Sequence, residues 1–219
     1  MAGVPDSAYV QLDFLVEKAR FNEHKKISKE KKLKPLHGTP RWDTLLAKVK
    51  RNFIASEAAF KKSKENEKKA VSFHDSLRGK AAVPFSCTDV NGKKYELSAL
   101  KGKVIVFNFW ATWCGPCKME MPELNKVKEK FKGQDVVFIS FCDNVDSIAI
   151  LNKNLAKNPF TYVMVIGEDA RKLNKLYAVS SIPVNIVIDK NGIVTFLEAG
   201  YAPHVVTEME HKIEKSLED

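Results

Sequence analysis

Two cysteines separated by two residues, Cys114 and Cys117, are the part of this sequence best suited to chemistry. They follow a continuous apolar run, Val104–Trp110, which is interrupted only by Asn108. Such a run predicts a buried strand, and the residues after Cys114 predict a helix. The pair is therefore expected at a strand-to-helix junction, with Cys114 at the helix N-terminus and Cys117 about one turn further on.

This placement predicts a reactive dithiol. The unpaired N–H groups and the positive end of the helix dipole stabilise a thiolate at Cys114, which makes it a nucleophile near neutral pH. Attack on a substrate disulfide gives a mixed disulfide, which Cys117 is placed to resolve. Gly115 and Pro116 bring the two sulfurs within bonding distance, and Pro116 favours the start of a helix.

A zinc site and a structural disulfide are the other common uses of such a pair. Zinc needs further ligands, but Cys87 and Cys142 are isolated and the five histidines form no His-x₃₋₅-His pattern, so no metal is expected. A loop of four residues removes little entropy from the unfolded chain, which makes a structural disulfide a weak explanation. Cys87 and Cys142 each lie in a predicted strand and are expected to be small buried hydrophobes, with a second disulfide as the alternative.

The elements around the pair predict an α/β domain. After residue 82, short β-type runs alternate with helical ones, which is the pattern of a sheet with helices packed on it. Asn-Gly pairs at 91–92 and 191–192 indicate two hairpin turns. The expected strands are 85–88, 94–97, 104–110, 136–142, 161–166, 184–189 and 193–198, and the expected helices are 117–130, 145–157, 170–177 and 203–217.

The first 80 residues differ in composition from the rest. They hold 19 Lys and Arg against 10 Asp and Glu, whereas residues 81–219 hold 17 of each, so the whole formal charge of +9 lies in the first part. Residues 9–34 predict one helix, and Asp43 is expected to cap a second, whose Lys/Glu run at 61–69 forms a solvated surface. We therefore expect a basic helical N-terminal region at 1–80 and the catalytic domain at 81–219.

Charge and hydropathy also limit the partners. A basic segment can attract nucleic acid, but no basic motif here is interleaved with aromatic residues, so a nucleic-acid partner is not expected. The sequence has no run of about 18 apolar residues, and residues 1–10 lack the pattern of a secretory signal. We expect a soluble chain that would contact a membrane only through a signal or anchor segment missing from this sequence.

The stretch KGKVIVFNFWATWCGPCKMEMP, residues 101–122, resembles the signature of the TlpA/ResA/CcmG family of thioredoxin-like proteins. The segment from Phe85 to Leu97 is similar to the family's N-terminal hairpin, so the resemblance covers about residues 82–217 and leaves residues 1–80 outside. It implies a thioredoxin-like α/β fold, with a central mixed sheet flanked by helices and an N-terminal β-hairpin. In this chain a helical region precedes that fold.

The resemblance also implies roles for single residues. Cys114 resembles the attacking thiol and Cys117 the resolving thiol, and Pro183, at the start of a predicted strand, resembles a cis-proline that faces them. Asn108 stands where thioredoxin has a buried Asp, so the proton acceptor for Cys117 is unassigned. Glu120 is a candidate, although stabilisation of the helix dipole would explain it equally well. Trp110 and Trp113 resemble the family's active-site aromatics. The implied substrate-binding residues are Trp113, Gly115, Pro116, Ile182 and Pro183.

The function implied is a protein-disulfide reductase of the periplasm or cell envelope, because Gly-Pro between the cysteines is typical of reducing members. It would need no cofactor. Its partners would be disulfide-bearing client proteins and an upstream dithiol electron donor, which links it to cell redox homeostasis and electron transport. Two alternatives are a peroxiredoxin-like peroxidase, whose Pro-x₃-Thr-x₂-Cys setting is missing here, and a client-binding module with a vestigial redox pair.

Overall fold

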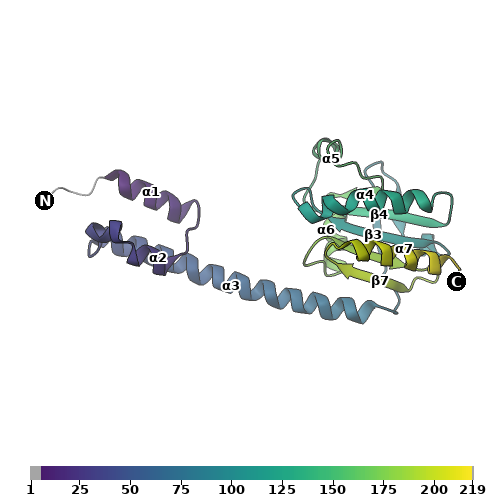
Figure 1. Ribbon diagram of the computed structural model, residues 1–219, viewed down its shortest axis with the longest axis horizontal. Coiled ribbons are helices and arrows are strands. Elements are labelled where there is room, and N and C mark those ends of the chain that lie inside the picture. Colours follow the sequence, from purple (N-terminus) through teal and green to yellow (C-terminus); the bar gives the residue numbers. More distant parts are fainter. Residues whose placement is uncertain (1–5, 219) are drawn as a thin grey trace. The chain divides into compact units, whose positions relative to one another are not determined.

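The computed structural model describes residues 6–218, and the chain divides into two compact units, Met1–Asn66 and Glu67–Asp219. The first unit contains α1 (Asp6–Glu17), α2 (His24–Lys29), the 3₁₀ helix η1 (Lys31–Leu36) and the first part of α3 (Pro40–Leu77) (Figure 1). The second unit contains the rest of α3 and all the strands. Residues 1–5, on which the expectation of no signal sequence partly rests, lie outside the described residues.

The first unit has its own small core. The single helix predicted for residues 9–34 is wrong, because the chain turns back after α1 through Arg20, whose φ is +50°. The turn lets Val16, Ile27 and Leu36 pack on α3, where a continuous helix would have separated them. The buried residues of this core are Tyr9, Val16, Ile27, Leu36, Trp42, Leu45 and Val49.

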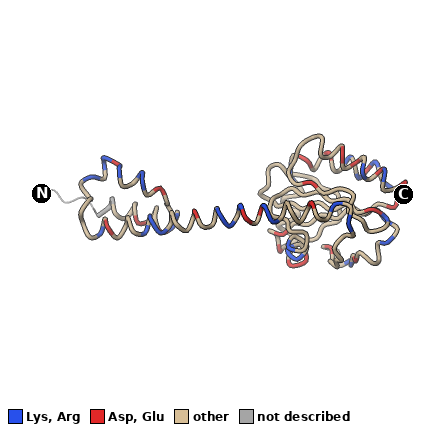
Figure 2. The backbone as a smooth tube through the Cα atoms, turned by 90° about the horizontal axis from the view of Figure 1, so that it is seen from below, with Lys and Arg blue, Asp and Glu red and all other residues tan. Residues whose placement is uncertain are grey.

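Helix α3 begins three residues before the predicted cap at Asp43. Thr39 caps it, because its Oγ1 accepts a 3.2 Å hydrogen bond from the backbone N–H of Trp42. Pro40 follows at the first helical position, where its missing N–H costs nothing. Further along α3, every residue from 57 to 69 is exposed, and lysines and glutamates are interspersed along this stretch (Figure 2). The solvated surface predicted at 61–69 is therefore confirmed.

The second unit is built on a five-stranded mixed sheet of order β5-β4-β3-β6-β7. Strand β3 runs parallel to β4 and antiparallel to β6, so it lies at the centre and all seven of its residues are buried. A separate hairpin, β1 with β2, precedes it. The strands are β1 (Ser86–Thr88), β2 (Lys94–Glu96), β3 (Val104–Trp110), β4 (Val136–Cys142), β5 (Val163–Ile166), β6 (Val184–Ile188) and β7 (Val194–Ala199).

Helices cover both faces of this sheet. Val104 and Val106 of β3 belong to a core that includes residues of α4 (Gly115–Lys130), α5 (Ile148–Leu155) and α7 (Pro203–Glu218). Ile105 and Phe107 alternate with them and belong to a second core, which includes residues of α6 (Gly167–Leu176). Figure 1 shows α4 and α7 together in front of the sheet. The predicted α/β fold with its hairpin is confirmed. A short 3₁₀ helix, η2 (Leu97–Leu100), follows the hairpin.

The end of α3 belongs to the second unit. His74 Nε2 lies 2.8 Å from the carbonyl oxygen of Tyr177, and Leu77 is buried in the second core. Beyond the helix, Arg78 donates through Nη2 to the carbonyl oxygen of Leu197 at 2.6 Å. No helix among residues 6–218 is both long and apolar enough to cross a membrane.

Candidate active site

The two cysteines lie at the predicted strand-to-helix junction. Cys114 is the N-cap of α4, and the two residues are joined in a disulfide with 5.4 Å between their Cα atoms. The backbone N–H of Cys117 points at Sγ of Cys114, with 3.1 Å between nitrogen and sulfur. This N–H is one of those left unpaired by the helix, and after reduction it can donate to a thiolate. Pro116, which lacks an N–H, occupies the first turn at no cost.

The surface beside the pair is formed by residues that the sequence analysis assigned to substrate binding. Both cysteines are buried, with 3% of Cys114 and 1% of Cys117 exposed, but Trp113 is 72% exposed. The carbonyl oxygen of Ile182 lies 3.9 Å from Sγ of Cys114, and the bond from Ile182 to Pro183 is cis, as predicted. Segments 68 residues apart in the sequence thus meet at one sulfur atom.

A buried carboxylate lies one turn beyond Cys117. Glu120 is fully buried, and its Oε1 and Oε2 accept hydrogen bonds from the side-chain amides of Asn108 at 2.8 Å and Asn185 at 3.2 Å. Asn108 and Asn185 are paired residues of β3 and β6, and Nδ2 of Asn108 also donates to Oδ1 of Asn185 at 2.9 Å. Burial raises the pKa of Glu120 to about 7, although the two amide hydrogen bonds act in the opposite direction.

This carboxylate points inward, so its role is not explained by the helix dipole. The sequence analysis missed Asn185, which forms part of the site. A signal was available, because Asn185 is a polar residue within an otherwise apolar predicted strand, just as Asn108 is. Such residues need polar partners when they are buried, and a buried polar partner is a candidate for the site.

The loop before Cys114 is held by the segment that follows β4. Oδ1 of Asn144 accepts from the backbone N–H of Thr112 at 3.0 Å, and Nδ2 of Asn144 donates to Oγ1 of Thr112 at 2.7 Å. The thiol of Cys142 also donates to Oδ1 of Asn144, at 3.2 Å. One side chain therefore fixes the backbone two residues before the attacking cysteine.

Comparison with protein families identifies the domain. The model of the AhpC/TSA family matches residues 78–197, more than half of the chain. The chain belongs to this family. Curated relatives include thiol-disulfide oxidoreductase ResA from Bacillus cereus (strain ZK / E33L), which is 40% identical over 114 residues, or 52% of this chain and 65% of the relative. ResA from Bacillus subtilis (strain 168) is 36% identical over 122 residues, or 56% of this chain and 67% of the relative.

Solved structures agree with this AhpC/TSA assignment. A protein assigned as thiol:disulfide interchange protein DsbE from Chlorobium tepidum has a TM-score of 0.57 at 27% identity, covering 64% of this chain and 97% of that one. A protein assigned as a thiol-disulfide oxidoreductase from Bacteroides vulgatus has a TM-score of 0.53 at 31% identity, covering 64% and 97%. The predicted thioredoxin-like fold and the resemblance to the TlpA/ResA/CcmG family are confirmed.

The remaining two cysteines of this AhpC/TSA domain are free and buried, as expected, and do not form a second disulfide. Burial raises the pKa of each thiol, Cys87 and Cys142, to about 12, so neither is a thiolate near neutral pH. Within residues 6–218, no cluster of three His, Cys, Asp or Glu residues is arranged to hold a metal ion. The dithiol is therefore the reactive group that the described residues offer.

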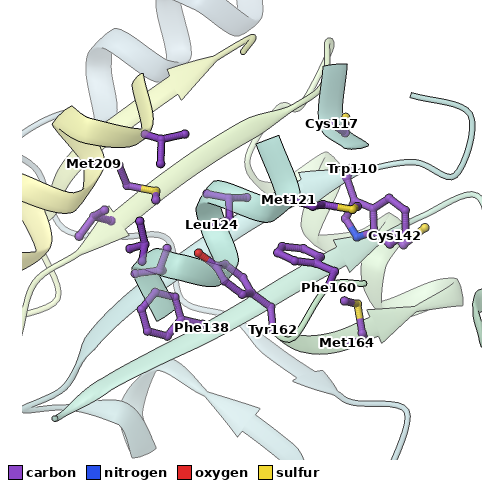
Figure 3. Close-up of a cluster of buried hydrophobic side chains, with 14 of the residues drawn as sticks. Trp110, Cys117, Met121, Leu124, Phe138, Cys142, Phe160, Tyr162, Met164 and Met209 are labelled. Carbon is purple, nitrogen blue, oxygen red and sulfur yellow. The ribbon is translucent and has the colours of Figure 1, made fainter. Parts of the chain in front are cut away.

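The inner side of the AhpC/TSA site is lined by buried apolar side chains. Figure 3 shows Cys117 at the start of α4, with Met121 and Trp110 below it and Phe160 beside them, and all four belong to one buried cluster. Such surroundings exclude water from the inner sulfur and from Glu120, which strengthens the electrostatic interactions there. Access to the pair is from the side of Trp113.

Proposed function

We propose that this chain is a thiol-disulfide oxidoreductase that reduces disulfides in client proteins. The observation that carries the proposal is the contact between the N–H of Cys117 and Sγ of Cys114, 3.1 Å long, at the first turn of α4. That N–H stabilises negative charge on Cys114 and leaves the thiol of Cys117 as the resolving group. The names of the ResA relatives support the proposal, although the chain spans only 65% of the length of the first of them.

The reaction runs in two exchanges. The reduced Cys114 thiolate attacks one sulfur of the client disulfide, forms a mixed disulfide, and displaces the client's other sulfur as a thiolate that takes up a proton. Cys117 then loses its proton and attacks Sγ of Cys114. This step releases the second client thiolate and forms the Cys114–Cys117 disulfide. Two electrons have then passed to the client, and an upstream dithiol must return them.

Glu120 is the proposed proton acceptor for Cys117. It lies three residues further along α4, and with its pKa raised to about 7 its carboxylate can take up a proton near neutral pH. Asn108 and Asn185 hold its two oxygens in place. Thioredoxin has a buried Asp at the position of Asn108. In this chain Asn108 carries no carboxylate and instead donates a hydrogen bond to the carboxylate of Glu120 on α4.

Client binding is assigned to the exposed rim of the pair. The carbonyl of Ile182 would accept a hydrogen bond from the backbone of an extended client segment, with Pro183 holding that segment in line. Trp113, Gly115 and Pro116, which are exposed and lie next to the cysteines in the sequence, would complete this surface. We infer a periplasmic or cell-envelope location from the resemblance to the TlpA/ResA/CcmG family, together with a role in electron transport and redox homeostasis there. We also infer that the helical N-terminal region predicted at residues 1–80 has a role apart from the dithiol chemistry.

Insulin reduction tests this proposal. The full chain with dithiothreitol should precipitate insulin chains at least tenfold faster than dithiothreitol alone, and Cys114→Ser should abolish the acceleration. Equal rates with and without the protein, or an unaffected Cys114→Ser variant, would contradict it. Peroxide consumption is measured with the same samples to distinguish a reductase from a peroxidase. A peroxidase would consume peroxide without a disulfide client.

A further inference from the structure

The exposed large apolar side chains of the second unit are concentrated in two short segments. Among its described residues, five such side chains are at least two-fifths exposed: Val71, Trp113, Met119, Ile148 and Ile150. Four of them lie in the segments that follow β3 and β4, and only Val71 lies elsewhere, on α3. A cluster of apolar groups on a protein surface marks an interaction site more often than single scattered ones do.

The topology brings these two segments to the same edge of the sheet. Strands β3 and β4 are parallel neighbours, and Trp110 pairs with Cys142 at their carboxyl ends. The side chain of Asn144 then links the two loops through both of its hydrogen bonds to Thr112. The segment that carries Trp113 and the segment that leads into α5 are therefore fastened together.

Packing places α5 on the same face as the start of α4. Leu151 of α5 is buried in the cluster that contains Cys117 and Met121. With Leu151 facing inward, Ile148 and Ile150 remain outward, with 49% and 55% of their surface exposed. This helix thus buries Leu151 in the same core as the redox pair and exposes Ile148 and Ile150 to solvent.

We propose that Ile148 and Ile150 extend the client-binding surface of the redox pair, and that the preferred client is a polypeptide with apolar side chains flanking its cystine. The inference rests on the proposed function. We assign this surface to the client because it continues from the surface around Cys114. A client whose disulfide reaches Cys114 must cover Trp113, and the residues that flank its cystine then pass over α5. Apolar flanks would bury Ile148 and Ile150, whereas polar flanks would lose their hydration there without compensation.

The test compares three disulfides on the full-length chain. Two are synthetic peptides with the same cystine loop, one flanked by Leu and Phe and the other by Ser and Gly, and the third is bis(2-hydroxyethyl) disulfide. In the double variant Ile148→Ser/Ile150→Ser, KM for the Leu/Phe peptide should rise about tenfold with kcat unchanged. The other two disulfides should be reduced as by the wild type. Val71→Ser removes an equally exposed side chain, 55% as for Ile150, and is the matched control.

Several results would overturn the inference. These are an unchanged KM for the Leu/Phe peptide, an equal loss with all three disulfides, or the same loss in Val71→Ser. A concentration-dependent dimer that the double variant abolishes, seen by sedimentation with KM unchanged, would assign the patch to a second copy instead. If the double variant melts at a lower temperature, Ile150→Ser alone is used and must raise KM for the Leu/Phe peptide selectively. Failure of the proposed function looks different, because the wild type would then reduce none of the three.

Discussion

The side-chain amide of Asn108 donates a 2.8 Å hydrogen bond to Oε1 of Glu120, and so holds a carboxylate inside the domain one turn beyond Cys117. The carboxylate is fully buried. Among the described residues, its hydrogen bonds come from two side-chain amides and none comes from a cationic group. Burying a charge in this way is costly, so the protonated form is favoured in the folded state. A measurable pH dependence of stability follows.

Replacing Glu120 with Gln should stabilise the protein at high pH. The folded pKa of about 7 lies above the ordinary value of 4.5, so the folded state binds the extra proton between these values and loses stability as pH rises through them. Relative to Glu120→Gln, the wild type should lose about 3 kcal/mol of unfolding free energy between pH 4 and pH 8. Urea denaturation across this range measures it. Glu123→Gln, an exposed change on the same helix, should give no such difference, and a constant gap between wild type and Glu120→Gln would contradict the assignment.

The same substitution should slow the resolving step. Without a carboxylate to take the proton of Cys117, release of client from the mixed disulfide at pH 7 should fall roughly 10- to 100-fold, while formation of the mixed disulfide stays unchanged. Stopped-flow tryptophan fluorescence with a peptide disulfide separates the two phases. Equal rates for both phases in wild type and variant would remove Glu120 from the mechanism.

Cys114 should react faster than Cys117 with alkylating agents. The N–H of Cys117 points at its sulfur and stabilises the thiolate, and Cys114 is the more exposed of the two, at 3% against 1% for Cys117. In the reduced protein at pH 7, iodoacetamide should label Cys114 at least tenfold faster, as measured by peptide mass spectrometry. Preferential labelling of Cys117 would reverse the two roles.

Asn144→Ala should loosen the loop before Cys114. The change removes two solvent-exposed hydrogen bonds to Thr112, at a cost of about 0.5–1.5 kcal/mol of unfolding free energy. Hydrogen exchange at the N–H of Thr112 should accelerate accordingly. Asn144→Asp keeps an acceptor for that N–H and should restore most of its protection. Unaltered exchange at Thr112 in Asn144→Ala would show that the clamp is dispensable.

The end of α3 should be needed for the stability of the thioredoxin-like domain. A chain of residues 67–219 keeps His74, Leu77 and Arg78, whereas a chain of residues 81–219 loses the buried side chains of His74 and Leu77 and several hydrogen bonds. We expect the shorter chain to be less stable by about 3–6 kcal/mol, and both to keep the dithiol chemistry when folded. Denaturant melts and insulin reduction on the two chains test this. Equal midpoints would place the domain boundary at residue 80, as the composition of the sequence suggests.

Much of the domain was predictable because local patterns and long-range packing agree there. Val104–Trp110 and Val136–Cys142 have the bounds expected from their apolar runs, since both strands are buried on two faces. The first unit was harder to predict. Its turn places Arg20 in the left-handed region, and the sequence has neither Gly nor Asn at this position to signal it. The turn is stabilised by contacts between α1 and α3, which are distant in the sequence.

The site was predictable as far as its motif extends. Cys114, Cys117 and the cis bond before Pro183 follow from the sequence signature, which is local. The hydrogen bonds to Glu120 and Thr112 depend on which residues face each other across strands, as for Asn108 with Asn185. That pairing is fixed by the register of the sheet, and a single sequence does not specify the register between distant strands.

Trapping on Cys114 tests the central claim most directly. A reduced Cys117→Ser variant is mixed with a peptide disulfide, quenched with acid, digested and analysed by mass spectrometry. The proposed mechanism predicts close to one peptide per chain, attached at Cys114, because the attacking thiolate is present and the resolving thiol is not. No adduct on Cys114, or an equal yield on Cys117 in the matched Cys114→Ser variant, would contradict it.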